Sequence, residues 1–173
     1  MKYYPLIIYL LYAFYRLWEL VYYSLFNEKE MKKRGAHEYG KGISSFLRAS
    51  YIIIFPAAIL EYFWAGRSLT VYWIGGWSLV VVVAAVIRHW VIQTLGGRGG
   101  YWTVKVLVFS GQKIITHGPF KYLKHPNYVS LIFEVLGLTL ILKTYLSFVL
   151  IFPFYSVLIY FRIKTEEKAM SGI

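Results

Sequence analysis

The chain has 173 residues, a length that suits one domain, yet 58% of them are hydrophobic and 20% are aromatic. A soluble core of this size could not bury so much apolar surface, which excludes an ordinary water-soluble fold. The net charge of +11 comes from short basic segments between long apolar runs. This pattern argues against nucleic acid as a partner and favours membrane lipids. Without cysteine, the sequence offers no disulfides and no thiolate metal sites.

The apolar runs predict an all-α integral membrane protein with about five transmembrane segments. They cover residues 3–26, 43–64, 69–90, 128–142 and 145–161. Each of the first three is long enough for a helix to cross about 30 Å of hydrocarbon. The last two are separated only by Lys143 and Thr144 and predict a helical hairpin, whose first arm is short for a full crossing.

Two polar stretches separate these runs. Residues 27–42 form a charged, glycine-bounded loop, and residues 96–127 begin with GGRGG and continue as a basic, amphipathic segment. We expect strand-like or irregular structure in the second stretch, capping the cytoplasmic side. The excess of Lys and Arg in both stretches predicts that they and the tail at 162–173 are cytoplasmic, with the N-terminus outside.

The sequence GPFKYLKHPNY at residues 118–128 concentrates polar donors immediately before the hairpin. Pro126 removes a backbone donor and pushes His125 away from helical geometry, so an irregular segment presents the imidazole. Such a segment suits a ligand site. The alternative is a basic and aromatic belt at the membrane surface, the role that we expect for Trp73, Trp77 and Trp102.

A second polar cluster, RIKTEEK at residues 162–168, follows the last apolar run. Arg162 and Glu166 share one face if the helix continues through them. An arginine near a carboxylate suits a site that holds an anionic substrate and a cationic cofactor together. The alternative is a solvated helix end with an ordinary ion pair.

Charged residues inside the apolar runs need partners. Arg16 and Glu19 are three residues apart and are expected to pair on one helix face. Glu134 lies within the first hairpin arm, where it either contacts substrate or pairs with a neighbouring side chain. His37 and His89 lack ligand spacing, so no metal site is predicted.

The two polar clusters together resemble the paired motifs of the isoprenylcysteine carboxyl methyltransferase family. The family pattern is Gly-x-(Tyr/Phe)-x-x-x-(Arg/Lys)-His-Pro-x-Tyr, a hairpin, and then Arg-x-x-x-Glu-Glu. Here GPFKYLKHPNY is followed by a hairpin and RIKTEE. Lys124 stands where the eukaryotic pattern prefers Arg, and the stretch GGRGGYW looks like an insertion. RLWEL at residues 16–20 and the first polar loop are similar to a prokaryotic branch that includes alkylpyrone O-methyltransferases.

The resemblance implies one methyltransferase domain over residues 1–173, with a three-helix part at 1–95 and a catalytic, cofactor-binding part at 96–173. The cofactor would be S-adenosylmethionine, with S-adenosylhomocysteine as product, and the catalytic residues Arg162, Glu166 and His125. Substrate contacts are expected from Arg162 and Glu134. Cofactor contacts are implied for Lys105, Gln112, Lys113, Ile114, Ile115, Phe120, His125, Pro126, Asn127, Tyr128 and Glu166.

The implied reaction is O-methylation of a lipophilic acceptor that arrives from the bilayer. A prenylcysteine carboxylate is ionised and needs no base, whereas an alkylpyrone-like hydroxyl could need one, and the sequence leaves both open. Two further alternatives stay open: a phospholipid N-methyltransferase, and a membrane protein that binds or transports lipids. In a prokaryote the protein would lie in the cell membrane.

Overall fold

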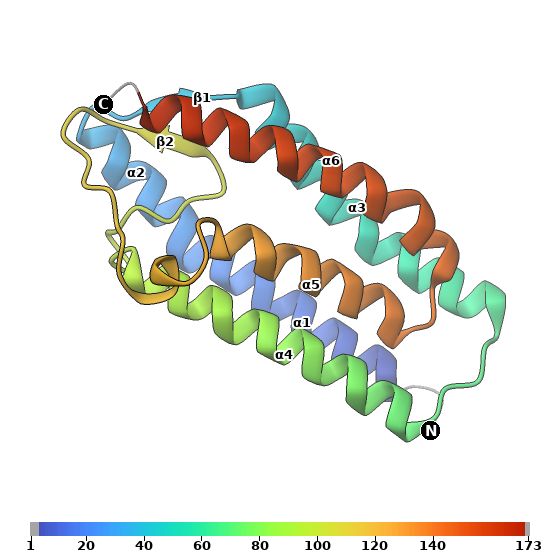
Figure 1. Cartoon of the computed structure of the whole chain (residues 1–173). Helices are drawn as coiled ribbons and strands as arrows, with labels where there is room; N and C mark the ends of the chain where they lie inside the picture. The colour runs from blue at the N-terminus through green and yellow to red at the C-terminus, as the bar shows by residue number, and fades with distance from the viewer. Residues whose placement is uncertain (1–3, 172–173) are drawn as a thin grey trace.

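The computed structural model describes residues 4–171, which form a bundle of long helices with a two-stranded sheet at one end (Figure 1). Residue 3, where the first span was predicted to begin, and residues 172–173 of the predicted tail lie outside this range. The helical elements are α1 (Tyr4–Glu19), the π-helical η1 (Leu20–Leu25), α2 (Phe26–Lys33), α3 (Lys41–Ala65), α4 (Val71–Thr94), the 3-10 helix η2 (Gly118–Lys121), α5 (Pro126–Ile141) and α6 (Tyr145–Met170). The strands are β1 (His37–Tyr39) and β2 (Val106–Val108).

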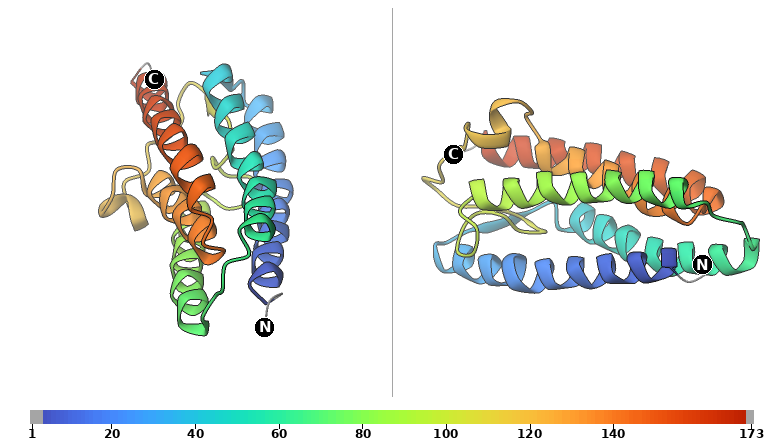
Figure 2. Two further views of the ribbon diagram at one scale, coloured as in Figure 1. Left: turned by 90° about the vertical axis from the view of Figure 1, so that its right-hand side faces the viewer. Right: turned by 90° about the horizontal axis from the view of Figure 1, so that it is seen from below.

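The five long helices run roughly side by side, with α1 and α3 on one side and α4, α5 and α6 on the other (Figure 2). Helix α5 packs against α4 and α6, and α6 also packs along α3. One apolar cluster joins α3, α5 and α6 through Ile54, Val135 and Ile159, each almost fully buried. The start of α5 and the end of α6 are therefore brought to the same end of the bundle.

Three helices, α3, α4 and α6, are long and apolar enough to cross a membrane, so the prediction of an integral membrane protein holds. Helix α5 has 16 residues, about 24 Å at 1.5 Å per residue, short of the roughly 30 Å of hydrocarbon. The bundle exposes large apolar side chains such as Leu60, Leu79 and Leu150, which lipid would solvate. Three of the five predicted spans therefore have helices long and apolar enough to cross, counted over residues 4–171.

The prediction that residues 27–42 form a loop is wrong for their first part. The N-terminal helix continues through η1 and α2 as far as Lys33. Ion pairs one turn apart support this extension: the Nζ of Lys32 lies 2.7 Å from Glu28, and the Nζ of Lys33 lies 2.7 Å from Glu30. Strand β1 follows and pairs antiparallel with β2, Glu38 opposite Leu107. The strand-like structure expected in the second polar stretch is thus confirmed for β2.

The predicted hairpin is confirmed by α5 and α6. Its turn places Lys143 at φ 53°, and the Thr144 hydroxyl donates to the carbonyl of Thr139 at 2.8 Å. Helix α6 runs on past its apolar part to Met170. Arg162 and Glu166 consequently lie one turn apart on the same continuous helix.

Four charges are buried together between α1, α4 and α5. Arg16 pairs with Glu19, as the sequence predicts, and its Nε lies 2.7 Å from Oε1 of Glu134. Arg88 pairs with Glu134 and has its Nε 3.8 Å from Glu19, while the hydroxyl of Tyr51 donates to Glu134. Two positive and two negative charges thus balance one another, which makes them tolerable inside the bundle.

Candidate active site

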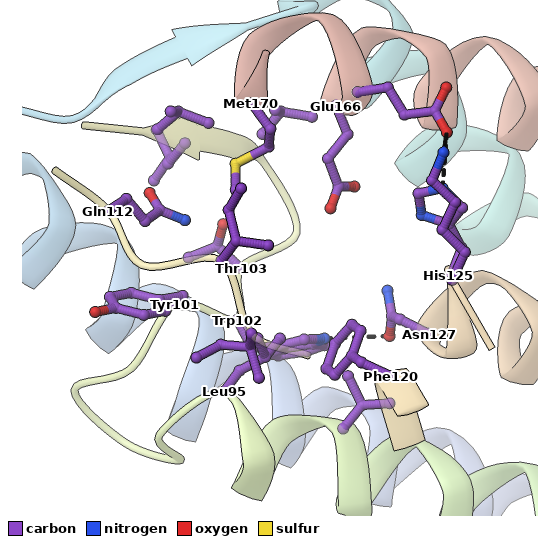
Figure 3. A pocket seen from close by; sticks show the side chains of 18 of the residues that line it. Leu95, Tyr101, Trp102, Thr103, Gln112, Phe120, His125, Asn127, Glu166 and Met170 are labelled. Carbon is purple, nitrogen blue, oxygen red and sulfur yellow. Dashed lines mark hydrogen bonds and ion pairs between the residues drawn. The ribbon is translucent and has the colours of Figure 1, made fainter. Parts of the chain in front are cut away.

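A cavity of about 510 Å³ opens at the end of the bundle that carries the sheet (Figure 3). Its volume falls within the range of roughly 300–1,000 Å³ that is usual for small-molecule sites. Its walls come from the end of α4, the segment between α4 and η2, the start of α5 and the last turns of α6. It is lined by Val91, Leu95, Tyr101, Trp102, Thr103, Lys105, Val106, Leu107, Val108, Gln112, Lys113, Ile114, Ile115, Thr116, Phe120, Lys124, His125, Pro126, Asn127, Tyr128, Arg162, Glu166, Glu167, Met170 and Ser171.

Every residue to which the family resemblance assigns a cofactor contact lines this one cavity, and so does Arg162. They come from segments as distant in the sequence as Lys105 and Glu166. Glu134 is the exception among the predicted site residues. It does not line the cavity, and its carboxylate pairs with Arg16 and Arg88 in the buried cluster described above.

The turn before α5 is fastened to α6 by an ion cluster at the rim of the cavity. Pro126 begins α5, where its missing N–H costs no helical hydrogen bond, and His125 precedes it with the non-helical angles φ −131° and ψ 62°. The Nε2 of His125 lies 3.1 Å from Oε1 of Glu167. The Nζ of Lys124 lies 2.6 Å from the same oxygen. The imidazole is therefore held against α6 beside the cavity.

Tyr128 joins the two sequence motifs directly. Its hydroxyl donates a hydrogen bond to Glu166 and accepts one from Nε of Arg162 at 3.1 Å. Tyr128 is 6% exposed and Arg162 4% exposed, so their mutual contact is shielded from water, and the contact with Glu166 is partly buried. A phenol between a carboxylate and a guanidinium fixes the orientation of all three side chains, because each hydrogen bond involves a charged group.

Arg162 is held by two further groups that sequence reasoning did not single out. Its Nη1 donates to the hydroxyl of Ser44 on α3, and its Nη2 donates to the carbonyl of Val104 at 2.7 Å. All three guanidinium nitrogens thus donate to protein groups. Only the packing of α3 along α6 brings Ser44 to this place, 118 residues away in the sequence.

An aromatic wall faces the two carboxylates of α6, as Figure 3 shows with Trp102 and Phe120 opposite Glu166. Trp102 is 5% exposed, and its indole Nε1 donates to Oδ1 of Asn127 at 3.2 Å. The prediction that Trp102 anchors the protein at the membrane interface is therefore wrong. Composition could not reveal this, because tryptophan next to a basic segment is equally typical of an interfacial belt.

The side chain of Asn27 on α2 fixes the loop that contains Trp102 by three hydrogen bonds to its backbone. Its Nδ2 donates to the carbonyls of Gly97 and Trp102, each at 2.9 Å, and its Oδ1 accepts from the N–H of Gly99 at 2.6 Å. Asn27 is fully buried. Ser24 on η1 also holds this loop, because its hydroxyl accepts a hydrogen bond from the N–H of Val104 at 2.8 Å. The insertion-like GGRGGYW stretch is thus a wall of the cavity.

Lys105 reaches the cavity with its charge already partnered. Its Nζ lies 2.5 Å from Glu28 and 3.7 Å from Glu38. Partial burial alone would raise the pKa of Glu28, but the hydrogen bonds from Lys105 and Lys32 outweigh burial and lower that pKa below its ordinary value. Gln112 closes a turn beside it, where its backbone N–H donates to the carbonyl of Phe109 at 3.1 Å.

The matching family profile is that of the isoprenylcysteine carboxyl methyltransferase (ICMT) family, over residues 77–172. This range takes in the cavity walls formed by α4, η2, α5 and α6. The chain belongs to this family. Membership makes it a membrane protein of a methyltransferase family, in agreement with the three apolar helices.

Two relatives extend the similarity into the N-terminal part. The chain is 33% identical over 144 residues to the uncharacterized protein YpbQ of Bacillus subtilis, covering 83% of each chain. It is 31% identical over 151 residues to an uncharacterized protein of Haemophilus influenzae, covering 87% of this chain and 86% of the relative. No solved structure matches the chain significantly. Asn27, Glu28 and Ser44, which hold the cavity walls, all lie before the range that the family profile matches.

Proposed function

We propose that this protein is an S-adenosylmethionine-dependent O-methyltransferase whose lipophilic acceptor reaches the cavity from the membrane. The observation that carries the proposal is the contact of Tyr128 with both Arg162 and Glu166 at the cavity wall. It joins two motifs of a methyltransferase family in one site, beside helices that are apolar enough to lie in lipid.

The lining has the chemistry that S-adenosylmethionine requires. Glu166 and Glu167 supply carboxylates for its positive charges, and Trp102 and Phe120 supply apolar faces for a flat base. Polar groups of Asn127 and Gln112 border the same space. When bound, the cofactor offers a methyl group on a positively charged sulfur to a nearby oxygen nucleophile.

The residues of the chain would contribute mainly by positioning, since methyl transfer needs the acceptor oxygen in line with the methyl group. The rigid Arg162–Tyr128–Glu166 chain would keep that wall of the cavity fixed. An ionised carboxylate acceptor needs no base, whereas a hydroxyl loses a proton, which His125 or Glu166 could accept.

Both acceptor classes, the alkylpyrone-like hydroxyl and the prenylcysteine carboxylate, are compatible with this lining. Three of the five guanidinium N–H groups of Arg162 donate to Tyr128, Ser44 and Val104, and one N–H on each terminal nitrogen remains for a carboxylate. The ammonium groups of Lys105 and Lys124 are paired with carboxylates, and Lys113 lines the same cavity.

We further propose that the cavity end of the bundle is cytoplasmic, with the N-terminus outside, in the cell membrane of a prokaryote. The basic residues of both polar stretches gather at that end, as the positive-inside bias requires. Glu134 is left out of the proposed acceptor site because its charge is taken up by Arg16 and Arg88.

The test is binding of S-adenosylhomocysteine to the detergent-purified protein, followed by transfer from methyl-labelled S-adenosylmethionine to hydroxyl, carboxylate and amine lipids. Wild type should bind the product analogue, and Glu166→Ala and His125→Ala should weaken binding, while Glu30→Ala on α2, away from the cavity, should not. A well-folded wild type without affinity would exclude the methyltransferase and favour a lipid-binding protein. Transfer to an ethanolamine lipid alone would instead support the phospholipid N-methyltransferase.

A further inference from the structure

Ser44 connects the first turn of α3 to the proposed catalytic wall. It is fully buried, its hydroxyl accepts from Nη1 of Arg162, and it donates to the carbonyl of Gly40 at 3.1 Å. A serine hydroxyl has one proton and two lone pairs, so it can do both at once. Nothing in the sequence around Ser44 distinguishes it from the neighbouring Ser45, which is exposed.

The beginning of α3 is seated closely on α6 at this point. Gly40 has φ +57°, and a Cβ atom there would lie 2.5 Å from Cγ2 of Thr165. A side chain at position 40 would be strained by the backbone angle and would also collide with α6. Because Thr165 adjoins Glu166, the glycine lets Ser44 approach the helix turn that carries the site.

The orientation of the Arg162 guanidinium determines which hydrogen bonds the Tyr128 hydroxyl makes. Ser44 and the Val104 carbonyl occupy the two terminal nitrogens, which leaves Nε aimed at the Tyr128 hydroxyl. Since Arg162 only donates, the single proton of that hydroxyl is free to go to Glu166. Hydrogen bonding thus runs without a break from Gly40 on one side of the bundle to Glu166 in the cavity.

We propose that Ser44 is a positioning residue for the methyltransferase site, acting through Arg162 and Tyr128 on the carboxylate of Glu166. The inference rests on the proposed function and deepens it, because it assigns part of the site to the N-terminal half, before residue 77 where the family profile begins. Without Ser44, Arg162 loses one of the three acceptors that fix its guanidinium, and Glu166 loses its fixed orientation toward the cofactor.

The experiment is calorimetric titration of S-adenosylhomocysteine into wild type, Ser44→Ala, Ser44→Cys, Ser44→Thr and Ser45→Ala, each in detergent. Titration separates the dissociation constant of the folded protein from the stoichiometry, which falls when part of the sample is unfolded. Removing a buried hydrogen bond to a charged group typically weakens an interaction by about tenfold or more. We expect Ser44→Ala and Ser44→Cys to raise the dissociation constant by about that factor, Ser44→Thr to restore it within about twofold, and Ser45→Ala to match wild type.

A purely structural serine would lower the stoichiometry and the melting temperature of Ser44→Ala and leave the dissociation constant unchanged, which would overturn the inference. Should Ser44→Ala fail to fold, Ser44→Cys decides, since it fills the space that alanine leaves empty and offers only a weak acceptor. Wild-type affinity in Ser44→Cys would refute the role. A folded wild type that does not bind would overturn the proposed function together with this inference, an outcome distinct from binding that ignores Ser44.

Discussion

Replacing Glu134 by Gln removes one charge from the buried cluster and leaves the shape of the side chain nearly unchanged. Glu134 is fully buried, pairs with Arg16 at 2.7 Å and with Arg88, and accepts from Tyr51. In Glu134→Gln, two guanidinium groups would face the single carboxylate of Glu19. A positive charge would then remain uncompensated inside the bundle.

Breaking a buried ion pair by removing one partner costs roughly 3–5 kcal/mol. The amide oxygen of Gln still accepts from Tyr51, so we expect the lower end, about 3 kcal/mol. For a protein of this size, that corresponds to a fall in melting temperature of roughly 6–12 °C. Adding Arg88→Met restores the charge balance, and at least half of the lost stability should return, since removing both partners of a buried pair is far less damaging than removing one.

Thermal unfolding in detergent, followed by circular dichroism, measures these effects. Glu30→Gln is the control, because Glu30 forms a single, solvent-accessible ion pair within residues 4–171, with Lys33, and its loss should leave the melting temperature unchanged. A Glu134→Gln variant that melts with wild type would refute the account of the cluster. If that stable variant raised the KM for the lipid acceptor and left cofactor affinity unchanged, Glu134 would belong to the substrate site.

Three further changes test the cavity walls. Asn27→Ala removes three hydrogen bonds to the loop that precedes β2, and it should cost roughly 1–3 kcal/mol in chemical unfolding and weaken cofactor affinity in titration. Gly118 has φ +62°, and Gly118→Ala places a Cβ 2.7 Å from the Thr94 hydroxyl oxygen. We expect η2 to shift and the dissociation constant of S-adenosylhomocysteine to rise several-fold. Adding Thr94→Ser to Gly118→Ala should recover little affinity, because serine keeps that oxygen. The lowered pKa of Glu28 contributes stability that is fully present above its ordinary value of 4.5 and is lost as the pH falls through the lower folded-state pKa. Acid unfolding of Glu28→Gln should therefore lack this component, and Lys105→Met should remove the share due to Lys105 and leave that due to Lys32.

The sequence alone determined that the protein requires lipid around it and which types of side chain form the site. Long apolar runs require lipid whatever their arrangement, and the two polar clusters flanking the hairpin carry the histidine, tyrosine, arginine and glutamate that meet in the cavity. The pairing of Arg16 with Glu19 also followed from local spacing, since residues three apart on a helix are neighbours.

The tertiary structure decided which distant side chains hold the site together. Ser44, Asn27 and Trp102 are ordinary polar or aromatic residues in their local sequence, and only the packing of α3 on α6 and of α2 on the following loop makes them partners of the cavity. The tertiary structure also determined the partners of Glu134. A charge in an apolar run requires a partner, but the local sequence does not identify that partner. Helix spacing is local information, whereas the contacts that orient Arg162 depend on helices that meet across 118 residues of chain.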